Sequence, residues 1–285
     1  MSKFPLTDAE IAAFIDVAFE EDIGRGDITV ESVIPATAIL KATMNAREDM
    51  IVAGLPLMDP IFRRLDPTCR VTFSVHDGNK LYAGDTILTV AGQARALLSA
   101  ERTALNIVQH LSGIATMTRC YVDQITDTGA TLLDTRKTIP GLRALGKYAA
   151  ATGGAQNHRM GLYDAVMIKD NHIAVAGSVE TAVHSAKAAG SEDVQVECDT
   201  LEQVREAVGA GANSLLLDNM PPAMLRQARA IVNGVIPCEA SGGVNLDTIR
   251  AIAETGVEFI SVGRLTQSAP AVDIGLDYTP ETDSS

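Results

Sequence analysis

From residue 130 onward, short apolar runs alternate with alanine-rich helical stretches, and this alternation strongly limits the possible folds. The apolar runs lie at 131–134, 164–169, 194–197, 214–218, 236–239 and 258–262. The stretches between most of them include 178–189, 200–210, 222–233 and 246–255. Apolar strands separated by helices are typical of a parallel sheet that is covered on both faces. The C-terminal part is therefore predicted to be an α/β domain.

Each of these runs ends in a polar or charged residue. The six residues are Asp134, Lys169, Glu197, Asp218, Glu239 and Ser261. Because α/β barrels build their active sites at the C-terminal ends of their strands, the pattern favours a barrel. An open doubly wound sheet is the alternative, but no GxGxxG motif follows an early strand. Six or seven recognisable strands are fewer than the eight of a complete barrel.

The N-terminal part of the chain shows a different pattern. Thr7 and Glu10 fit a capping box, which predicts an amphipathic helix, and a turn-rich segment follows at 20–29. A helix capped by Ser99 and ending near residue 125 is expected to link the two parts. A small sheet with few helices is predicted from the strand-like runs at 39–46, 51–54, 70–75 and 86–90.

Charge is distributed unevenly along the 285-residue chain. Its formal net charge is −13, but residues 134–172 contain six Lys or Arg against three Asp or Glu, a local charge of +3. A basic cluster in an acidic chain indicates a site for a small ligand with several negative charges. Nucleic acid is not expected as a partner, because its binding needs a broad basic surface.

Hydropathy and cysteine usage predict a cytoplasmic protein. No stretch approaches about 18 uninterrupted apolar residues, so no membrane span is expected, and the N-terminus lacks the apolar region of a signal peptide. The four cysteines are far apart, form no zinc-binding spacing and are interpreted as reduced thiols. They are Cys69, Cys120, Cys198 and Cys238. A chemical role for Cys198 or Cys238 stays open.

Several residue types at the predicted strand ends suit an anionic ligand. Arg136, Arg159 and Lys169 fit carboxylates or phosphates, because arginine offers a two-donor fork and lysine a compact charge. His158 is either a further donor or a surface or capping histidine. Glu197 and Asp218 provide hard oxygen atoms, which commonly hold Mg²⁺ opposite a phosphate-bearing substrate. For any one strand-end residue, a cap for the following helix is the alternative.

Two turns of small residues follow late strands. They are Ser241-Gly242-Gly243 and Ser261-Val262-Gly263. Backbone N–H groups in such turns, together with a helix N-terminus, can bind phosphate. Many α/β barrels build a phosphate site after their last strands, so the pair of turns predicts such a site.

Longer motifs occur in order along nearly the whole chain. The N-terminal ones are Glu21-Asp22-x-Gly24-x-Gly26-Asp27-x-Thr29, Glu101-Arg102-Thr103-Ala104-Leu105-Asn106 and Leu111-Ser112-Gly113-Ile114-Ala115-Thr116. The others are Asp134-Thr-Arg-Lys-Thr-x-Pro-Gly-Leu-Arg143, Lys147-Tyr148-Ala149, Asn157-His158-Arg159, Ile168-Lys169-Asp170-Asn171-His172, Leu217-Asp218-Asn219-Met220, Glu239-Ala240-Ser241-Gly242-Gly243 and Ser261-Val262-Gly263. Together they resemble the quinolinate phosphoribosyltransferase family, also called nicotinate-nucleotide pyrophosphorylase (carboxylating). Ala155 stands where the family usually has a glycine, and a left-handed conformation there would be disfavoured.

The resemblance implies a fold and an assembly. The fold is an N-terminal α/β sandwich domain at 1–111 and an incomplete, seven-stranded α/β barrel at 112–267, with the tail 268–285 packing back on the first domain. The assembly is a homodimer with shared active sites, in which Arg102 reaches the site of the neighbouring subunit. A higher oligomer stays open.

The resemblance also assigns roles to individual residues. The quinolinate carboxylates would be surrounded by Arg102, Arg136, Lys137, His158, Arg159 and Lys169, with Thr135 also binding substrate. Glu197 and Asp218 would face the ribose and the Mg²⁺ of phosphoribosyl pyrophosphate, directly or through water. The 5′-phosphate would be bound by Ser241, Gly242, Gly243, Val262, Gly263 and Arg264. The residues expected to act in catalysis are Lys137, Lys169, Glu197 and Asp218.

The implied reaction transfers phosphoribosyl from phosphoribosyl pyrophosphate to quinolinate, with loss of CO₂. Its products are nicotinate mononucleotide and pyrophosphate, and it serves NAD biosynthesis. One alternative is a paralogue of the same fold, called ModD, whose substrate is different. Others are nicotinate phosphoribosyltransferase, which takes a mono-acid and couples to ATP, and a non-catalytic ligand-binding barrel. The segment 169–172 and the complete set of matched charged residues favour the quinolinate enzyme.

Overall fold

The computed structural model describes residues 3–279, which form two compact units. The second unit comprises Thr118–Arg143 and Gly154–Ser268, and the first unit takes the rest of the described chain. Within the described part, no helix is both long and apolar enough to cross a membrane. The two units carry different kinds of sheet.

The first unit is built on a four-stranded antiparallel sheet. One face of its strand β1 (Ile39–Ala46) buries Ala42, Met44 and Ala46, as expected where a core covers a single face of a sheet. The strand order is β12 (Ile274–Thr279), β1 (Ile39–Ala46), β5 (Thr86–Gln93) and β3 (Arg70–Phe73). A separate short ladder joins β2 (Met50–Ile51) to β4 (Lys80–Leu81). The last described strand of the chain thus pairs with the first.

Short helices complete the first unit. Thr7 caps the first of them, because its hydroxyl accepts from the Glu10 N–H at 3.3 Å and its own N–H donates to the Glu10 carboxylate at 2.8 Å. The predicted capping box is therefore confirmed. The helices are α1 (Asp8–Asp22), α2 (Ile28–Val33), η1 (Leu55–Leu57), α3 (Met58–Leu65) and, apart from its first residue, α5 (Arg143–Gly153).

The long linking helix α4 (Ala94–Ile125) begins earlier than the sequence predicted. Strand β5 ends at Gln93, which is still paired with Ile39, and the helix follows directly. Ser99 therefore lies inside the helix and does not cap it. Its hydroxyl donates to Asp27 Oδ2 at 3.0 Å. The expectation that the helix ends near residue 125 is confirmed, and α4 runs from the first unit into the second.

The second unit contains a six-stranded parallel sheet. The order is β6 (Thr131–Leu133), β11 (Phe259–Ser261), β10 (Cys238–Ser241), β9 (Ser214–Asp218), β8 (Val194–Cys198) and β7 (Val166–Ile168). Beyond β6, Gln156 makes an isolated parallel bridge with Leu133. Among the described residues, the seventh strand that the family resemblance implies is thus reduced to a single bridging residue.

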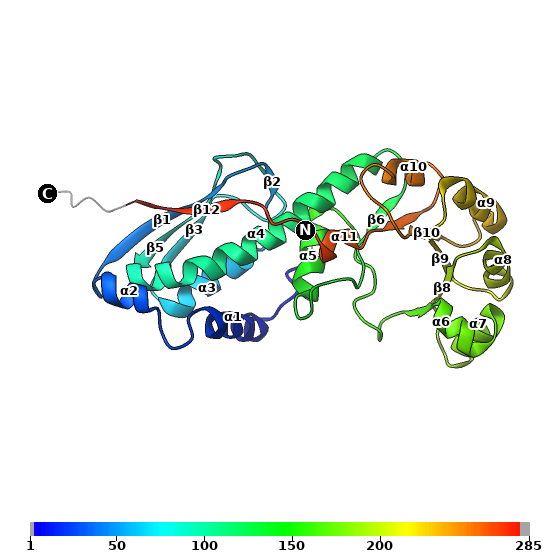
Figure 1. Ribbon diagram of the computed structural model, residues 1–285, viewed down its shortest axis with the longest axis horizontal. Helices are drawn as coiled ribbons and strands as arrows, with labels where there is room; N and C mark the ends of the chain where they lie inside the picture. Colours follow the sequence, from blue (N-terminus) through cyan, green and yellow to red (C-terminus); the bar gives the residue numbers. More distant parts are fainter. Residues whose placement is uncertain (1–2, 280–285) are drawn as a thin grey trace. The chain divides into compact units, whose positions relative to one another are not determined.

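Helices cover the outer side of these strands, as Figure 1 shows for β8, β9 and β10. The helices that follow the strands of this unit are α6 (Asp170–Ala176), α7 (Val179–Ala188), α8 (Leu201–Gly209), α9 (Pro222–Val232), α10 (Ile249–Ala253) and α11 (Arg264–Gln267). Along β8, Val194, Val196 and Cys198 are buried, whereas Gln195 and Glu197 are only partly buried. Alternate residues of a strand point to opposite faces, so the strand sends its polar side chains inward, away from the helices.

Candidate active site

A cavity of about 560 Å³ lies at the C-terminal ends of the parallel strands of the second unit. Every residue that the sequence predicted for the site lines it, except Arg102. The predicted residues are Thr135, Arg136, Lys137, His158, Arg159, Lys169, Glu197, Asp218, Ser241, Gly242, Gly243, Val262, Gly263 and Arg264. Arg102 is exposed on α4 in the first unit. The cavity thus combines five cationic side chains with carboxylates.

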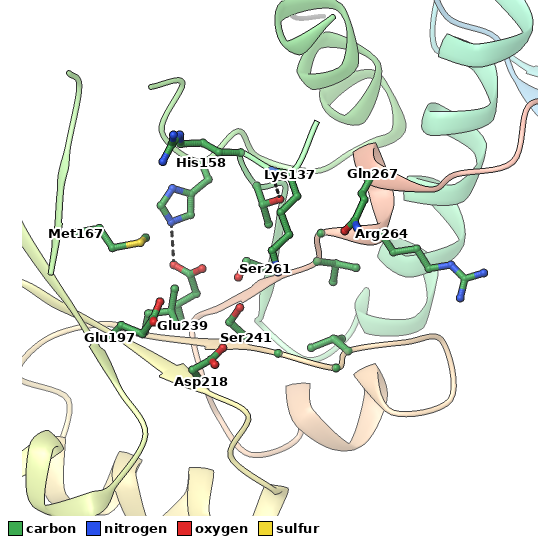
Figure 2. Close-up of a pocket in the computed structure, with 18 of the residues that line it drawn as sticks. Lys137, His158, Met167, Glu197, Asp218, Glu239, Ser241, Ser261, Arg264 and Gln267 are labelled. Carbon is green, nitrogen blue, oxygen red and sulfur yellow. Dashed lines mark hydrogen bonds and ion pairs between the residues drawn. The ribbon is translucent and has the colours of Figure 1, made fainter. Parts of the chain in front are cut away.

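Six further residues line the cavity without having been assigned to it from the sequence. They are Met167, Leu216, Glu239, Val244, Ser261 and Gln267. Glu239 and Ser261 were recognised only as strand ends. The sequence could have identified Glu239 as a site residue. It lies two positions before the predicted site residue Ser241 on β10, and residues two apart on a strand share a face. Figure 2 shows both side chains directed to the same region, beside Asp218.

Arg159 is held in the cavity wall by groups of its own chain segment. Its guanidinium donates to the Ala165 carbonyl at 3.1 Å and lies 3.5 Å from Met167 Sδ. Burial, and then the nearby charge of Arg136, lower the pKa of Arg159. The side chain still carries its charge at neutral pH, since the ordinary value for arginine lies far above this range. Two adjacent guanidinium groups that repel one another provide a strong attraction for an anion placed between them.

Lys169 and Glu197 form an ion pair at the ends of β7 and β8. The Lys169 side chain is 41% exposed and that of Glu197 is 13% exposed. The Lys169 end of the pair is therefore accessible to a ligand, whereas the Glu197 carboxylate is largely buried. Moving the lysine away would leave that carboxylate without its cation, which is costly for a buried charge.

His158 lies at the floor of the cavity, next to Glu239 (Figure 2). Its Nε2 is 3.2 Å from Glu239 Oε2, and its Nδ1 accepts from the Arg159 N–H at 2.7 Å. The fully buried Asp134 fixes the backbone here, because its two oxygens accept from the His158 N–H at 2.8 Å and from Asn157 Nδ2 at 2.6 Å. The Asn-His-Arg motif is thus anchored from the end of β6.

Two buried atoms of the cavity have no hydrogen-bond partner within residues 3–279. They are Arg136 Nε and Glu239 Oε1. Burying such atoms without a partner costs on the order of 1–3 kcal/mol each, and more where the group is charged. Such atoms are few in native proteins, and a catalytic role or a bound ion is one explanation for them. An anion can satisfy the Arg136 guanidinium.

The turn after β10 packs closely against Asn219, the residue that follows β9. Gly242 has a φ of +87°, and a Cβ added to it would lie 2.8 Å from the backbone nitrogen of Asn219. Asn219 itself has a φ of +53°, and its N–H donates to the Ser241 carbonyl at 2.9 Å. A Cβ on Gly263, after β11, would lie 2.8 Å from Lys137 Cδ. Side-chain-free turns at these two positions can present backbone N–H groups to a phosphate.

Glu197 and Asp218 are the carboxylates that could hold a divalent cation. They lie at the C-terminal ends of the neighbouring strands β8 and β9 and both line the cavity. The described residues contain no group of three or more side chains able to hold a metal ion by themselves. The two carboxylates nevertheless fit Mg²⁺, which is usually bound by one or two carboxylates together with substrate phosphates and water.

Two uncertain points of the sequence are settled by the backbone and by burial. Gly154, with a φ of +110°, takes the left-handed conformation, and Ala155 does not need it. Cys198 and Cys238 are buried. Burial raises the pKa of Cys198 to about 12 and also raises that of Cys238. Both are therefore neutral thiols at neutral pH, and neither lines the cavity.

Comparison with known proteins agrees with this arrangement. The model of the quinolinate phosphoribosyl transferase C-terminal domain matches residues 114–277, and the N-terminal domain model matches residues 27–112.

The chain belongs to the quinolinate phosphoribosyltransferase family.

Individual members of this family are similar over almost their full length. The probable nicotinate-nucleotide pyrophosphorylase (carboxylating) of Bacillus subtilis is 44% identical over 268 residues, covering 93% of this chain and 92% of the relative. The nicotinate-nucleotide pyrophosphorylase (carboxylating) of Mycobacterium leprae is 43% identical, covering 95% and 99%. The solved nicotinate-nucleotide pyrophosphorylase of Francisella tularensis superposes with a TM-score of 0.93 at 37% identity, covering 98% and 100%. The fold expected from the resemblance is confirmed.

Proposed function

We propose that this protein transfers the phosphoribosyl group of phosphoribosyl pyrophosphate to quinolinate and releases CO₂, forming nicotinate mononucleotide and pyrophosphate. The observation that carries this proposal is the pairing of two features in one cavity. A cluster of arginine and lysine side chains lines the cavity together with the turns of small residues that follow β10 and β11. Membership of the family and its relatives' printed names support the same activity.

The cationic side chains suit the two adjacent carboxylates of quinolinate. Arg136, Lys137, Arg159 and Lys169 come from three successive segments and line one cavity. Arginine binds a carboxylate through two parallel hydrogen bonds, which fixes orientation as well as charge. A mono-acid would leave part of this cluster without a partner. The cluster therefore favours a dicarboxylate over nicotinate.

The reaction can proceed by positioning and electrostatics. The ring nitrogen of quinolinate forms a bond to C1 of the ribose while the bond from C1 to pyrophosphate breaks. The 2-carboxylate then leaves as CO₂, its electron pair stays on the ring carbon next to the quaternised nitrogen, and a proton from water completes the product. Glu197 and Asp218 offset the positive charge that develops on the ribose, and the turns at 241–243 and 262–264 hold the 5′-phosphate. Mg²⁺, when bound with the substrate, would stabilise the leaving pyrophosphate.

We further propose that the protein acts as a cytoplasmic homodimer. Arg102 is exposed on α4, where it is available to a neighbouring subunit. A dimer in which Arg102 completes the partner's site would add a further cation to the carboxylate cluster. The four cysteines are all free thiols, as is usual in a reducing compartment.

Substrate competition tests the proposed function. Purified protein is mixed with phosphoribosyl pyrophosphate, Mg²⁺ and equal amounts of quinolinate and nicotinate, and nicotinate mononucleotide and CO₂ are followed together. We expect CO₂ release to match product formation, because quinolinate alone is consumed. Product without CO₂ would indicate the mono-acid enzyme. No product from either pyridine would indicate the ModD-like paralogue or a non-catalytic barrel.

A further inference from the structure

Glu239 lies between two cavities of the second unit. Behind the cavity of the proposed active site, a second one of about 330 Å³ is lined by residues at the N-terminal ends of the strands, including Asp193 and Ser214. Glu239, His158 and Arg159 line both cavities. The Glu239 side chain is 3% exposed. These three residues therefore form the layer that separates the two cavities.

The hydrogen bonds of His158 determine which ring nitrogen carries the proton. Nδ1 accepts from the Arg159 N–H, so it has no proton of its own. In the neutral ring the proton is then on Nε2, which donates to Glu239 Oε2. Both ring nitrogens are occupied within the protein. In this arrangement His158 fixes neighbouring groups and does not itself donate a ring N–H to a substrate carboxylate.

The Glu239 carboxylate is held firmly enough to determine this orientation. Its Oε2 also accepts from Gln195 Nε2 at 2.8 Å, so donors from two separate segments meet at one oxygen. On the other side of His158, Asp134 holds its backbone N–H. The imidazole therefore spans a fixed gap, from the backbone of the Asn-His-Arg segment to the inner face of β10 (Figure 2).

We propose that Glu239 is a positioning residue for the pyridine dicarboxylate. By keeping the proton of His158 on Nε2, it leaves Nδ1 to accept the Arg159 N–H and so fixes the segment that carries the Arg159 guanidinium. If the imidazole rotated, the Arg159 N–H would lose its acceptor, and the guanidinium would be held only by its contacts to Ala165 and Met167. This inference rests on the proposed function, because it assigns Arg159 to the substrate carboxylates.

Removing the Glu239 carboxylate should affect the binding of quinolinate and not that of phosphoribosyl pyrophosphate. The turn that binds phosphate is held by its own contact, from the Asn219 N–H to the Ser241 carbonyl. Loss of the Glu239 carboxylate should therefore weaken binding of quinolinate and leave binding of phosphoribosyl pyrophosphate nearly unchanged. Hydrogen-bond partners that fix the tautomer of a metal-binding histidine are typically worth about 10- to 100-fold in affinity or activity, and we expect an effect of the same order here.

Two substitutions and one control test the kinetic part. Glu239→Leu removes the acceptor at similar volume and is expected to raise the KM for quinolinate by roughly 10- to 100-fold, with the KM for phosphoribosyl pyrophosphate within about 2-fold. Glu239→Gln should stay near the wild type, because an amide oxygen can accept from both His158 and Gln195. Glu258→Gln removes a carboxylate that pairs with Arg229 at 2.7 Å and holds the Cys238 N–H at 2.8 Å. This control should change neither KM.

Nitrogen-15 NMR of labelled histidine tests the structural part without any turnover. His158→Asn assigns the signal, and the wild type and Glu239→Gln are expected to show the Nε2–H form, whereas Glu239→Leu shows a mixture of forms. A wild-type His158 protonated on Nδ1, or an equal rise of both KM values in Glu239→Leu, would overturn the proposal. If Glu239→Leu does not fold, the wild-type and Glu239→Gln spectra decide. Absence of quinolinate turnover with an Nε2–H spectrum would refute the proposed function alone.

Discussion

At the scale of single residues, the charges of the proposed site are held in place by partners within the protein. Lys169 pairs with Glu197, and Glu239 is held by His158 and Gln195. Arg136 keeps one buried nitrogen without a partner among residues 3–279. A site of this kind presents positive charge to an anion without a large reorganisation when the anion binds. Low reorganisation is what electrostatic catalysis requires.

Arg159→Lys tests the geometry of this charge. The substitution keeps the positive charge but loses the two-donor fork and the contacts to Ala165 and Met167. A hydrogen bond to a charged group is worth about 1.5–3 kcal/mol, so we expect kcat/KM for quinolinate to fall roughly 10- to 100-fold. Steady-state kinetics measure this. The exposed surface residue Arg205 gives the control Arg205→Lys, and an equal loss in both variants would contradict the account.

The cysteines give a prediction that depends on pH. Burial raises the pKa of Cys69, Cys198 and Cys238, whereas Cys120 is exposed. A thiol reagent at pH 8 should therefore modify Cys120 alone in the native protein and the other three after unfolding.

The same thiols make stability depend on pH. Above pH of about 8.5 the unfolded chain releases thiol protons that the folded chain retains, so the free energy of unfolding should decrease as pH rises. Rapid modification of more than one thiol in the native protein, or a free energy of unfolding that increases over this pH range, would contradict the burial of these three thiols.

At the scale of elements, strand ends and turns bring the site together. Lys169 directly follows β7, Glu197 is the last residue but one of β8 and Asp218 ends β9, and the turns after β10 and β11 complete the cavity. The helices on the outer side leave the inner face to polar side chains. The chemistry is therefore distributed over short segments that a rigid sheet holds in register.

Gly242→Ala tests the turn after β10. A side chain at a φ of +87° is strained, and its Cβ would lie 2.8 Å from the Asn219 backbone nitrogen. We expect a loss of about 1–3 kcal/mol of stability and a marked rise in the KM for phosphoribosyl pyrophosphate. Denaturant unfolding and kinetics measure the two effects. Gly243→Ala is a useful comparison, because its φ of +62° is also positive but no atom lies within 4 Å of an added Cβ. Equal effects of the two substitutions on KM would argue against the contact between the added Cβ at position 242 and Asn219 as the cause.

Much of this arrangement follows from sequence periodicity, and the exceptions have physical causes. Apolar runs and their polar ends predicted the strands at 194–197 and 214–218, because doubly buried strands leave a strong signal. The predicted start of α4 was wrong. The helix begins where strand pairing ends at Gln93, and not at a side-chain cap at Ser99. Glu239 was missed as a site residue, because its role depends on His158 and Gln195, which are distant in sequence. Pairings of this kind leave no local pattern.

At the scale of the whole molecule, the proposed dimer would place part of each site on a second subunit. Arg102 lies on α4 in the first unit, and the cavity is lined entirely by residues of the second unit. Symmetric dimers commonly share sites across their interface, because each residue on one side has an equivalent on the other. The exposed Arg102 guanidinium would then be a functional residue that its own chain does not use.

Mixing two inactive variants tests this sharing. Arg102→Ala and Lys169→Ala are each expected to be inactive, but a hybrid dimer would contain one site with both residues intact. After unfolding and refolding of an equal mixture, random pairing predicts about a quarter of the wild-type activity. Size-exclusion chromatography confirms that dimers have re-formed. Activity that stays at the level of the separate variants would place Arg102 in its own subunit's site or outside any site.

The central claim is that this protein joins phosphoribosyl transfer to loss of the 2-carboxylate of quinolinate. Quinolinate labelled with carbon-13 at that carboxylate, incubated with phosphoribosyl pyrophosphate and Mg²⁺, measures both events in one sample. The account predicts one labelled CO₂ for each nicotinate mononucleotide formed, and neither product when phosphoribosyl pyrophosphate is omitted. A labelled carboxylate that remains on the pyridine, whether or not a nucleotide forms, would contradict it.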